Sequence, residues 1–133
     1  MIVDASVVVK WFSVEALHEE ARELLERPEP LFAPDILVAD FANAMWIKVK
    51  RDEVDASQAA RALTAISGRG EPQLLPSVPL AGAAFELAQE LAHPVYDCVY
   101  LALAHDLDLP LRTADRRFAA AAEGHQRVHL LGR

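Results

Sequence analysis

The chain is poor in cysteine and glycine, and it contains no long hydrophobic run. A single cysteine, Cys98, excludes an internal disulfide framework and is typical of a protein in a reducing compartment. The apolar stretch at residues 7–9 is far too short to span a membrane. No basic segment with a cleavable apolar stretch follows Met1, so the sequence predicts no signal peptide. We therefore expect a cytoplasmic protein.

Basic residues are also scarce, with 13 Lys and Arg against 20 Asp and Glu and a net charge of −7. This balance argues against a protein that coats duplex DNA, because such proteins contact phosphates with Lys and Arg. We interpret much of the excess as one solvated helix face, formed by Glu15, Glu19, Glu20, Glu23, Glu26 and Glu29. The rest of the chain is closer to neutral, so a nucleic acid bound at a local metal site remains compatible with the sequence.

The chain has the length of one domain, which we place at residues 1–133, and 53% of its residues are hydrophobic. Short apolar strands are predicted at residues 1–3, 31–33, 73–75, 109–113 and 128–131. Helices are predicted at 6–12 with Ser6 as the cap, 15–27, 35–50, 55–67, 79–91, from 93 onward, and 115–122. This alternation predicts an α/β fold with a short central parallel sheet and helices on both faces.

Four aspartates lie in or beside apolar segments, where an unpaired carboxylate is energetically expensive: Asp4, Asp40, Asp97 and Asp115. Asp4 and Asp115 follow the first and fourth predicted strands, and ligands of open parallel sheets bind beyond the carboxyl ends of strands. Asp40 and Asp97 lie in predicted helices that pack on the sheet. If the four acids converge, they form a hard, oxygen-rich site suited to Mg²⁺ or Mn²⁺.

Each acid also has a simpler structural interpretation. Asp115 is a plausible N-cap, and Asp97 near a helix start is favoured by the helix dipole alone. Asp4 and Asp40 have weaker structural interpretations, because neither is predicted at a good capping position. The five histidines show no paired metal-ligand spacing, and we interpret them as surface or capping groups. Trp11 and Trp46 are interpreted as core or interface packing.

Four motifs in order give the whole chain a family resemblance. They are Met-Ile-Val-Asp-Ala-Ser (residues 1–6), Pro-Asp-x₄-Asp-x-x-Asn-Ala-x-Trp (34–46), Tyr-Asp-x-x-Tyr-Leu-Ala-Leu-Ala (96–104) and Leu-Arg-Thr-Ala-Asp-Arg-Arg-Phe (111–118). This set closely resembles the PIN domain, specifically the single-domain VapC type of toxin–antitoxin pairs. The resemblance implies a three-layer sandwich and a ribonuclease that hydrolyses RNA with metal-activated water, leaving a 5′-phosphate and a 3′-hydroxyl.

The resemblance also implies roles for individual residues. Asp4 and Asp97 correspond to direct ligands of Mg²⁺, for which Mn²⁺ can substitute, and one or two ions are compatible with the motifs. Asp40 and Asp115 complete the acidic pocket. The family commonly has Glu where this chain has Asp40, so the shorter side chain is expected to reach the metal through water. Supporting polar groups behind the acids are expected at Ser6, Asn43 and Thr113.

The partners implied by the resemblance are an RNA substrate, a second copy of the chain in a homodimer, and a VapB-type antitoxin. DNA would be contacted only through the antitoxin. We expect the antitoxin to cover the predicted helix at 15–27 or the helix pair at 35–67, and to place an Arg or Lys near the four acids. The alternative is a degenerate PIN domain that acts mainly as an antitoxin-binding module.

Two other enzyme classes with a comparable sheet fit less well. Haloacid dehalogenase phosphatases need a second Asp two residues after the first, where this chain has Ser6. A response-regulator receiver domain needs a paired acid near the first strand and a Lys after a late strand, and neither occurs here.

Overall fold

The computed structural model describes residues 1–68 and 70–133. Its centre is a sheet of five short strands: β1 (Ile2–Val3), β2 (Phe32–Pro34), β3 (Gln73–Leu75), β4 (Leu111–Thr113) and β5 (Val128–Leu130). The strand order is β3-β2-β1-β4-β5, and every neighbouring pair is parallel. Ile2 of β1 is in register with Phe32 on one side and Leu111 on the other.

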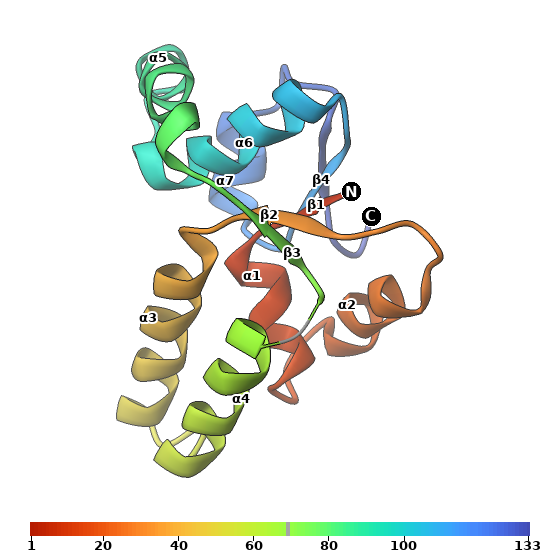
Figure 1. Cartoon of the computed structure of the whole chain (residues 1–133), viewed down its shortest axis with the longest axis vertical. Coiled ribbons are helices and arrows are strands. Elements are labelled where there is room, and N and C mark those ends of the chain that lie inside the picture. The colour runs from red at the N-terminus through yellow and green to blue at the C-terminus, as the bar shows by residue number, and fades with distance from the viewer. Residues whose placement is uncertain (69) are drawn as a thin grey trace.

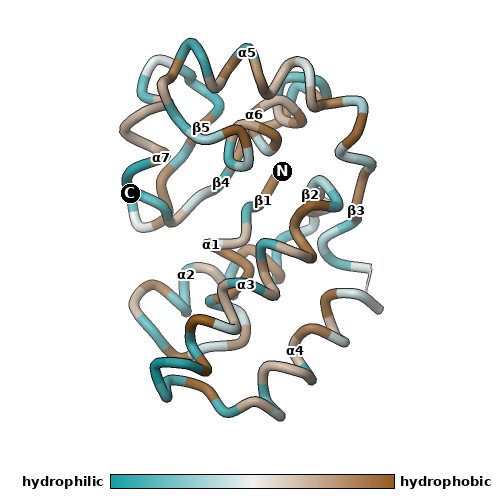
Figure 2. The backbone as a smooth tube through the Cα atoms, turned by 90° about the vertical axis from the view of Figure 1, so that its left-hand side faces the viewer, coloured by the Kyte–Doolittle hydropathy of each residue, from teal (hydrophilic) through white to brown (hydrophobic). Residues whose placement is uncertain are grey.

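The helical elements are α1 (Ala5–Val8), η1 (Val9–Trp11), α2 (His18–Glu23), η2 (Leu24–Glu26), α3 (Leu37–Lys50), α4 (Ala56–Gly68), η3 (Val78–Leu80), α5 (Ala81–Leu91), α6 (Val95–Leu107) and α7 (Arg116–Ala121). Figure 1 shows α5, α6 and α7 on one side of the sheet and α1, α3 and α4 on the other. Figure 2 shows the same three layers from a second direction. The predicted three-layer α/β sandwich is therefore confirmed.

Right-handed crossovers explain this division of the helices. The chain first runs from β1 outward through β2 to β3, and then returns past β1 to β4 and β5. Because parallel crossovers are almost always right-handed, the reversal of direction moves the later helices to the opposite face. The reversal leaves β1 and β4 as neighbours at the point where the strand order switches.

The core lies on both faces of β1, whose two residues are fully buried. Helix α6 is the most enclosed helix, because every residue from Cys98 to Ala104 is buried, which explains the continuous apolar run in this part of the sequence. Helix α3 buries Leu37, Phe41 and Met45, four residues apart, as expected of one face of an amphipathic helix. No helix within the described residues is both long and apolar enough to cross a membrane.

Some predicted helix ends are confirmed, and others are wrong. Asp55 caps α4 by accepting a hydrogen bond from the backbone N–H of Gln58 at 2.8 Å. The N-cap of α1 is Asp4 and not Ser6, because the Asp4 Oδ1 accepts from the backbone N–H of Val7 at 3.2 Å. Ser6 lies inside α1, where its hydroxyl is free to contact other groups.

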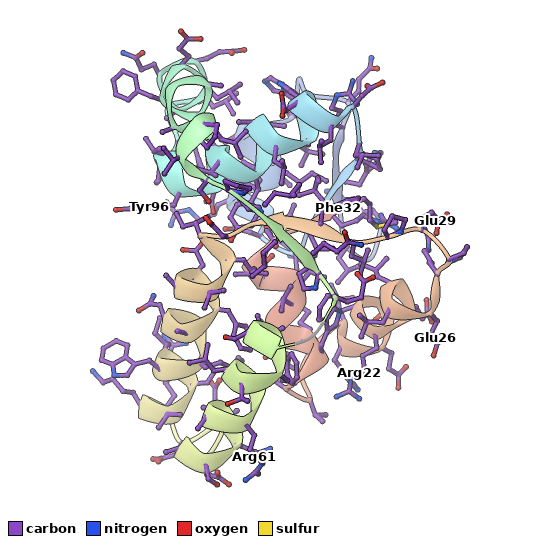
Figure 3. The ribbon with its side chains drawn as sticks, in the orientation of Figure 1. Arg22, Glu26, Glu29, Phe32, Arg61 and Tyr96 are labelled. Atoms are coloured by element: carbon purple, nitrogen blue, oxygen red, sulfur yellow. The ribbon has the colours of Figure 1, made fainter. Side chains whose placement is uncertain are left out.

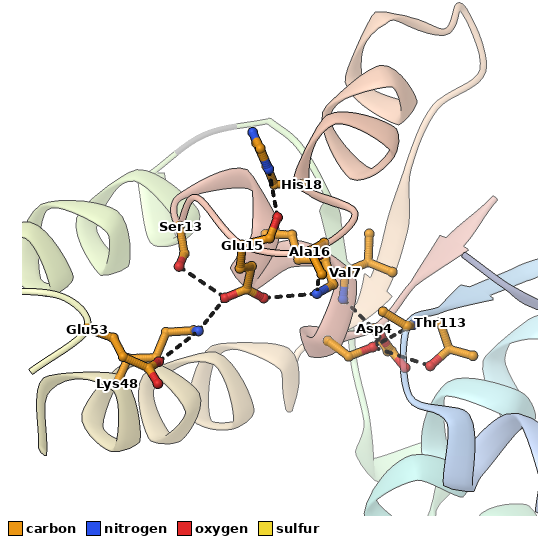
Figure 4. Close-up of polar contacts among 12 residues, drawn as sticks. Asp4, Val7, Ser13, Glu15, Ala16, His18, Lys48, Glu53 and Thr113 are labelled. Atoms are coloured by element: carbon orange, nitrogen blue, oxygen red, sulfur yellow. Dashed lines mark hydrogen bonds and ion pairs between the residues drawn. The ribbon is translucent and has the colours of Figure 1, made fainter. Parts of the chain in front are cut away.

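The predicted helix at 15–27 is shorter than expected and is not uniformly solvated. Leu17 has a left-handed backbone (φ 65°), so α2 begins only at His18, and Glu15 lies before the helix. Glu15 accepts hydrogen bonds from Lys10 at 3.0 Å and from Lys48 of α3 (Figure 4). Burial alone would raise the pKa of Glu15, but the bonds from Lys48 and Lys10 outweigh it and lower that pKa.

Glu26 and Glu29 match the prediction better. Figure 3 shows both side chains at the margin of the molecule, directed away from it. Part of the acidic segment is therefore a solvated surface, whereas Glu15 is half-buried and forms ion pairs that join the loop before α2 to α3.

Candidate active site

The four predicted aspartates line one cavity of about 260 Å³, together with Ala5, Ser6, Val9, Ala44 and Tyr100. Asp4 follows β1 directly, and Asp115 follows β4, the neighbouring strand. Asp40 lies in the first turn of α3 and Asp97 in the first turn of α6, on opposite layers of the sandwich. The sheet edge at the switch between β1 and β4 therefore brings carboxylates from both layers together, as open parallel sheets do at their ligand sites.

Asp4 is the most deeply placed of the four, with 4% of its surface exposed. Its Oδ1 accepts hydrogen bonds from the Ser6 hydroxyl at 2.5 Å and from the backbone N–H of Val7. Burial raises the pKa of Asp4 to about 6, the nearby charge of Asp97 adds to the rise, and the hydrogen bonds oppose it. The pKa of Asp4 is raised although several hydrogen bonds stabilise its ionised form, because no cation lies near enough to offset the cost of burial.

A hydroxyl network connects Asp4 to the segment that carries Asp115. Ser6 Oγ accepts from the backbone N–H of Ala114 at 2.8 Å, and Thr113 Oγ1 lies 3.3 Å from Ser6 Oγ. Thr113 Oγ1 in turn accepts from the backbone N–H of Asp115 at 3.0 Å. Because Ser6 donates its proton to Asp4, its Oγ can only accept from other groups, and a hydrogen bond from the Thr113 hydroxyl also lowers the pKa of Asp4. Both hydroxyls therefore lie directly behind the acids, as the resemblance implied.

Asp40 is held by a residue to which sequence reasoning gave no role. The Tyr100 hydroxyl donates to Asp40 Oδ2 at 2.7 Å and links α6 to α3 across the cavity. Burial raises the pKa of Asp40, and Asp97 raises it further, while the Tyr100 bond lowers it. Burial and the charge of Asp40 likewise raise the pKa of Tyr100, so its hydroxyl stays protonated and acts as a donor.

Asp97 is in close contact with His93, which we interpreted from the sequence as a surface or capping group. His93 Nε2 lies 2.6 Å from Asp97 Oδ2, and only 12% of the His93 side chain is exposed. That interpretation is therefore wrong for His93. Asp97 lines the same cavity as Asp4 and Asp40, and its charge adds to the raised pKa values of both.

Asp115 is the N-cap of α7, as its structural interpretation predicted, and it also lines the cavity. Its Oδ1 accepts from the backbone N–H groups of Arg117 at 2.9 Å and Phe118 at 3.1 Å. Asn43, in contrast, is exposed and is not among the residues that line the cavity. Asn43, three residues after Asp40, faces away from the cavity. Ala44, four residues after Asp40, lies on the cavity side of the helix instead.

The donor set fits a hard divalent cation. The groups that line the cavity include four carboxylates and, among the described residues, no Lys or Arg. Among residues 1–68 and 70–133, no group of three or more His, Cys, Asp and Glu side chains lies so that it could hold a metal ion between its members. A few separated carboxylates are suited to Mg²⁺, which keeps several of its waters and takes few protein ligands.

Comparison with known proteins gives a consistent family assignment. The family model described as PIN domain matches residues 1–124. Ribonuclease VapC1 of Mycobacterium tuberculosis is 34% identical over 123 residues, which cover 90% of this chain and 89% of that protein.

Solved structures show the same fold. A structure of M. tuberculosis VapC20, described as a sarcin–ricin loop cleaving toxin, covers 90% of this chain and 93% of its own, with a TM-score of 0.69 and 19% identity. A chain of a toxin–antitoxin complex from Klebsiella pneumoniae has a TM-score of 0.68 and 20% identity, and covers 96% and 94% of the two chains.

Proposed function

The chain belongs to the PIN domain family, and on that premise we propose that it is the toxin of a type II toxin–antitoxin pair. We infer that it is an Mg²⁺-dependent endoribonuclease that hydrolyses RNA phosphodiester bonds. The observation that carries the proposal is the convergence of Asp4, Asp40, Asp97 and Asp115 in one cavity without a cation from the protein. The names of VapC1, a ribonuclease, and VapC20, a sarcin–ricin loop cleaving toxin, support the same activity.

Asp4 and Asp97 are the proposed ligands of the metal. Bound Mg²⁺, or Mn²⁺ in its place, would make the attacking water more acidic and neutralise the charge that develops on the phosphate. Asp4 suits a ligand because Ser6 and Val7 fix its Oδ1. Asp97 suits one because it lies in the first turn of α6 and near both Asp4 and Asp40.

The other two acids are proposed to handle the attacking water. Asp115 keeps one oxygen on the amides of α7, so its orientation is fixed while it positions the water or accepts its proton. Tyr100 orients Asp40 in a similar way, because its hydroxyl donates to Oδ2. Within the described residues, Oδ1 then remains available for the water. Thr113 and Ser6 keep the segment around Asp115 at a constant distance from Asp4.

An apolar groove between α3 and α4 is the proposed docking site of the antitoxin. It has a volume of about 250 Å³ and is lined by Ala42, Met45, Trp46, Val49, Ala56, Ala59, Ala60 and Leu63. Trp46 is 57% exposed there, which does not fit packing inside the core and suits an interface. The antitoxin would also direct an Arg or Lys to the acidic cavity, since guanidinium groups pair well with carboxylates.

This groove favours one of the two surfaces expected from the sequence. Helix α2 is only six residues long and carries Glu19, Glu20 and Glu23, whereas α3 and α4 offer a continuous apolar surface. The Klebsiella structure supports a partner of this kind, because it is a toxin–antitoxin complex. A homodimer, which rests on the family resemblance, and a cytoplasmic location, which rests on the sequence features given above, remain parts of the proposal.

The proposal is tested by RNA cleavage with the purified protein and with Asp4→Asn and Asp97→Asn. We expect cleavage in Mg²⁺ that stops with EDTA and is lost in both variants. Asp106→Asn is the matched control, because Asp106 lies exposed in the last turn of α6, the helix that carries Asp97. A protein that binds its antitoxin but leaves RNA intact in Mg²⁺ and in Mn²⁺ would instead be a degenerate binding module.

A further inference from the structure

His93 lies at the junction between α5 and α6, and its backbone is held from both sides. Its N–H donates to the carbonyl of Ala88 in α5 at 3.2 Å. Ala92 before it adopts a left-handed conformation (φ 50°), and Pro94 after it is the N-cap of α6. The position of the imidazole is therefore set by the ends of two helices and not by a free loop.

The imidazole holds one oxygen of Asp97. His93 Nε2 lies 2.6 Å from Asp97 Oδ2, four residues further along the chain. An ionised carboxylate only accepts hydrogen bonds, so Nε2 carries the proton and donates it. With Oδ2 held in this way, Asp97 has one oxygen left for a cation, and single-oxygen ligation suits the octahedral shell of Mg²⁺.

The same ring contacts the helix that is capped by Asp115. The His93 ring stacks on Phe118 with 5.3 Å between ring centroids and 29° between planes. Phe118 is fully buried, and its backbone N–H donates to Asp115 Oδ1 at 3.1 Å. One side chain thus touches Asp97 directly and contacts the residue whose amide fixes Asp115.

We propose that His93 is a positioning residue that orients the Asp97 carboxylate for the metal and holds it in register with α7 and Asp115. This inference rests on the proposed function, and it adds a residue outside the four acids and the two hydroxyls behind them. Carboxylate ligands are commonly oriented by a hydrogen-bonded partner, and removing such a partner typically lowers metal affinity about 10–100-fold.

Two substitutions separate the hydrogen bond from the ring contact. His93→Gln keeps an N–H donor of similar reach and loses the imidazole stack, whereas His93→Phe keeps an aromatic ring on Phe118 and loses the donor. His93→Leu, which also lacks a donor, replaces His93→Phe if that variant does not fold. His129→Gln is the control, because His129 is exposed on β5.

The measurement is Mn²⁺ binding to the purified proteins, followed by the loss of the free-ion electron paramagnetic resonance signal, with metal-free melting temperatures alongside. We expect His93→Phe to bind Mn²⁺ about 10–100-fold more weakly than wild type. His93→Gln and His129→Gln should stay close to wild type. In cleavage assays, the loss in His93→Phe should appear as a higher Mn²⁺ concentration for half-maximal rate.

Wild-type Mn²⁺ affinity in His93→Phe overturns the inference. An equal loss in His93→Gln overturns it too, because an N–H donor at position 93 would then not be enough to orient Asp97. Failure of the proposed function has a different signature: Asp97→Asn would then bind Mn²⁺ as wild type does. If Mn²⁺ binding is weakened by Asp97→Asn but unchanged by His93→Phe, only the role of His93 is refuted.

Discussion

Replacing Asp4 with Asn should stabilise the metal-free protein, and the gain should depend on pH. Asp4 is buried and has no cationic partner, so its ionisation in the folded state is unfavourable. Asn has nearly the same shape, and its carbonyl oxygen still accepts hydrogen bonds from Ser6 and Val7. The substitution therefore removes a charge while keeping the cap of α1.

The size of the effect follows from the pKa. Burial and Asp97 raise the pKa of Asp4 from 3.8 to about 6, a rise of about 2 units, and each unit corresponds to about 1.4 kcal/mol. Because the folded pKa is the higher one, the stability contributed by protonated Asp4 is present below pH 4 and is lost as pH rises through 6. Relative to Asp4→Asn, wild type should lose about 2 kcal/mol of unfolding free energy between pH 4 and pH 7.

Urea unfolding in EDTA, followed by tryptophan fluorescence between pH 4 and pH 8, measures this difference. The two proteins should be similar near pH 4, and the variant should be more stable at pH 7, by roughly 4 °C in melting temperature per kcal/mol. The exposed control Asp106→Asn should show no such pH-dependent difference. A difference between wild type and Asp4→Asn that does not change with pH would refute the reasoning, as would a variant less stable than wild type at pH 8.

Three further predictions use other contacts. Mg²⁺ should raise the melting temperature of wild type by mass action and leave Asp4→Asn nearly unchanged, which thermal scans with increasing Mg²⁺ will show. Tyr100→Phe removes the bond that lowers the pKa of Asp40, so the acid limb of the cleavage pH profile should move to higher pH, with exposed Tyr96→Phe as the control. Trp46→Ala should weaken antitoxin binding by about 2 kcal/mol or more in calorimetry without changing cleavage, and equal affinity would remove the α3–α4 groove as the docking site.

The sequence predicted the architecture and the convergence of the acids because both depend on strong local signals. Strand β3 was predicted at its observed residues, since Leu74 and Leu75 follow Gln73 in a short segment between two prolines. The position of Asp4 and Asp115 at the same sheet edge followed from the alternation of strands and helices, whereas the strand order that makes β1 and β4 neighbours did not. Burial of an acid is expensive, so apolar surroundings alone identified the four positions.

Contacts between distant elements were not predictable in the same way. The Tyr100–Asp40 bond joins residues 60 apart in sequence, and the Lys48–Glu15 pair joins residues 33 apart. Glu15 lies in a segment rich in Glu, so the sequence predicts a surface acid. The neighbouring residues do not indicate the ion pair with Lys48 of α3. The His93 contact was within reach, since a histidine four residues before an acid lies on the same side of a helix start.

The structural and functional interpretations of these acids turn out not to be alternatives. Asp4 and Asp115 are N-caps, and Asp40 and Asp97 lie in first turns, so each carboxylate is at or near the amino end of a helix. Backbone N–H groups hold Asp4 and Asp115 through Oδ1, and the positive ends of α3 and α6 offset part of the repulsion among the four charges. Helix starts thus position the acids before any cation binds. These contacts do not cancel the cost of burying Asp4 and its repulsion from Asp97, so the pKa of Asp4 is still raised. Under the proposed function, this remaining cost is what a divalent ion relieves, which is why stability and metal binding should change together when one of these acids is neutralised.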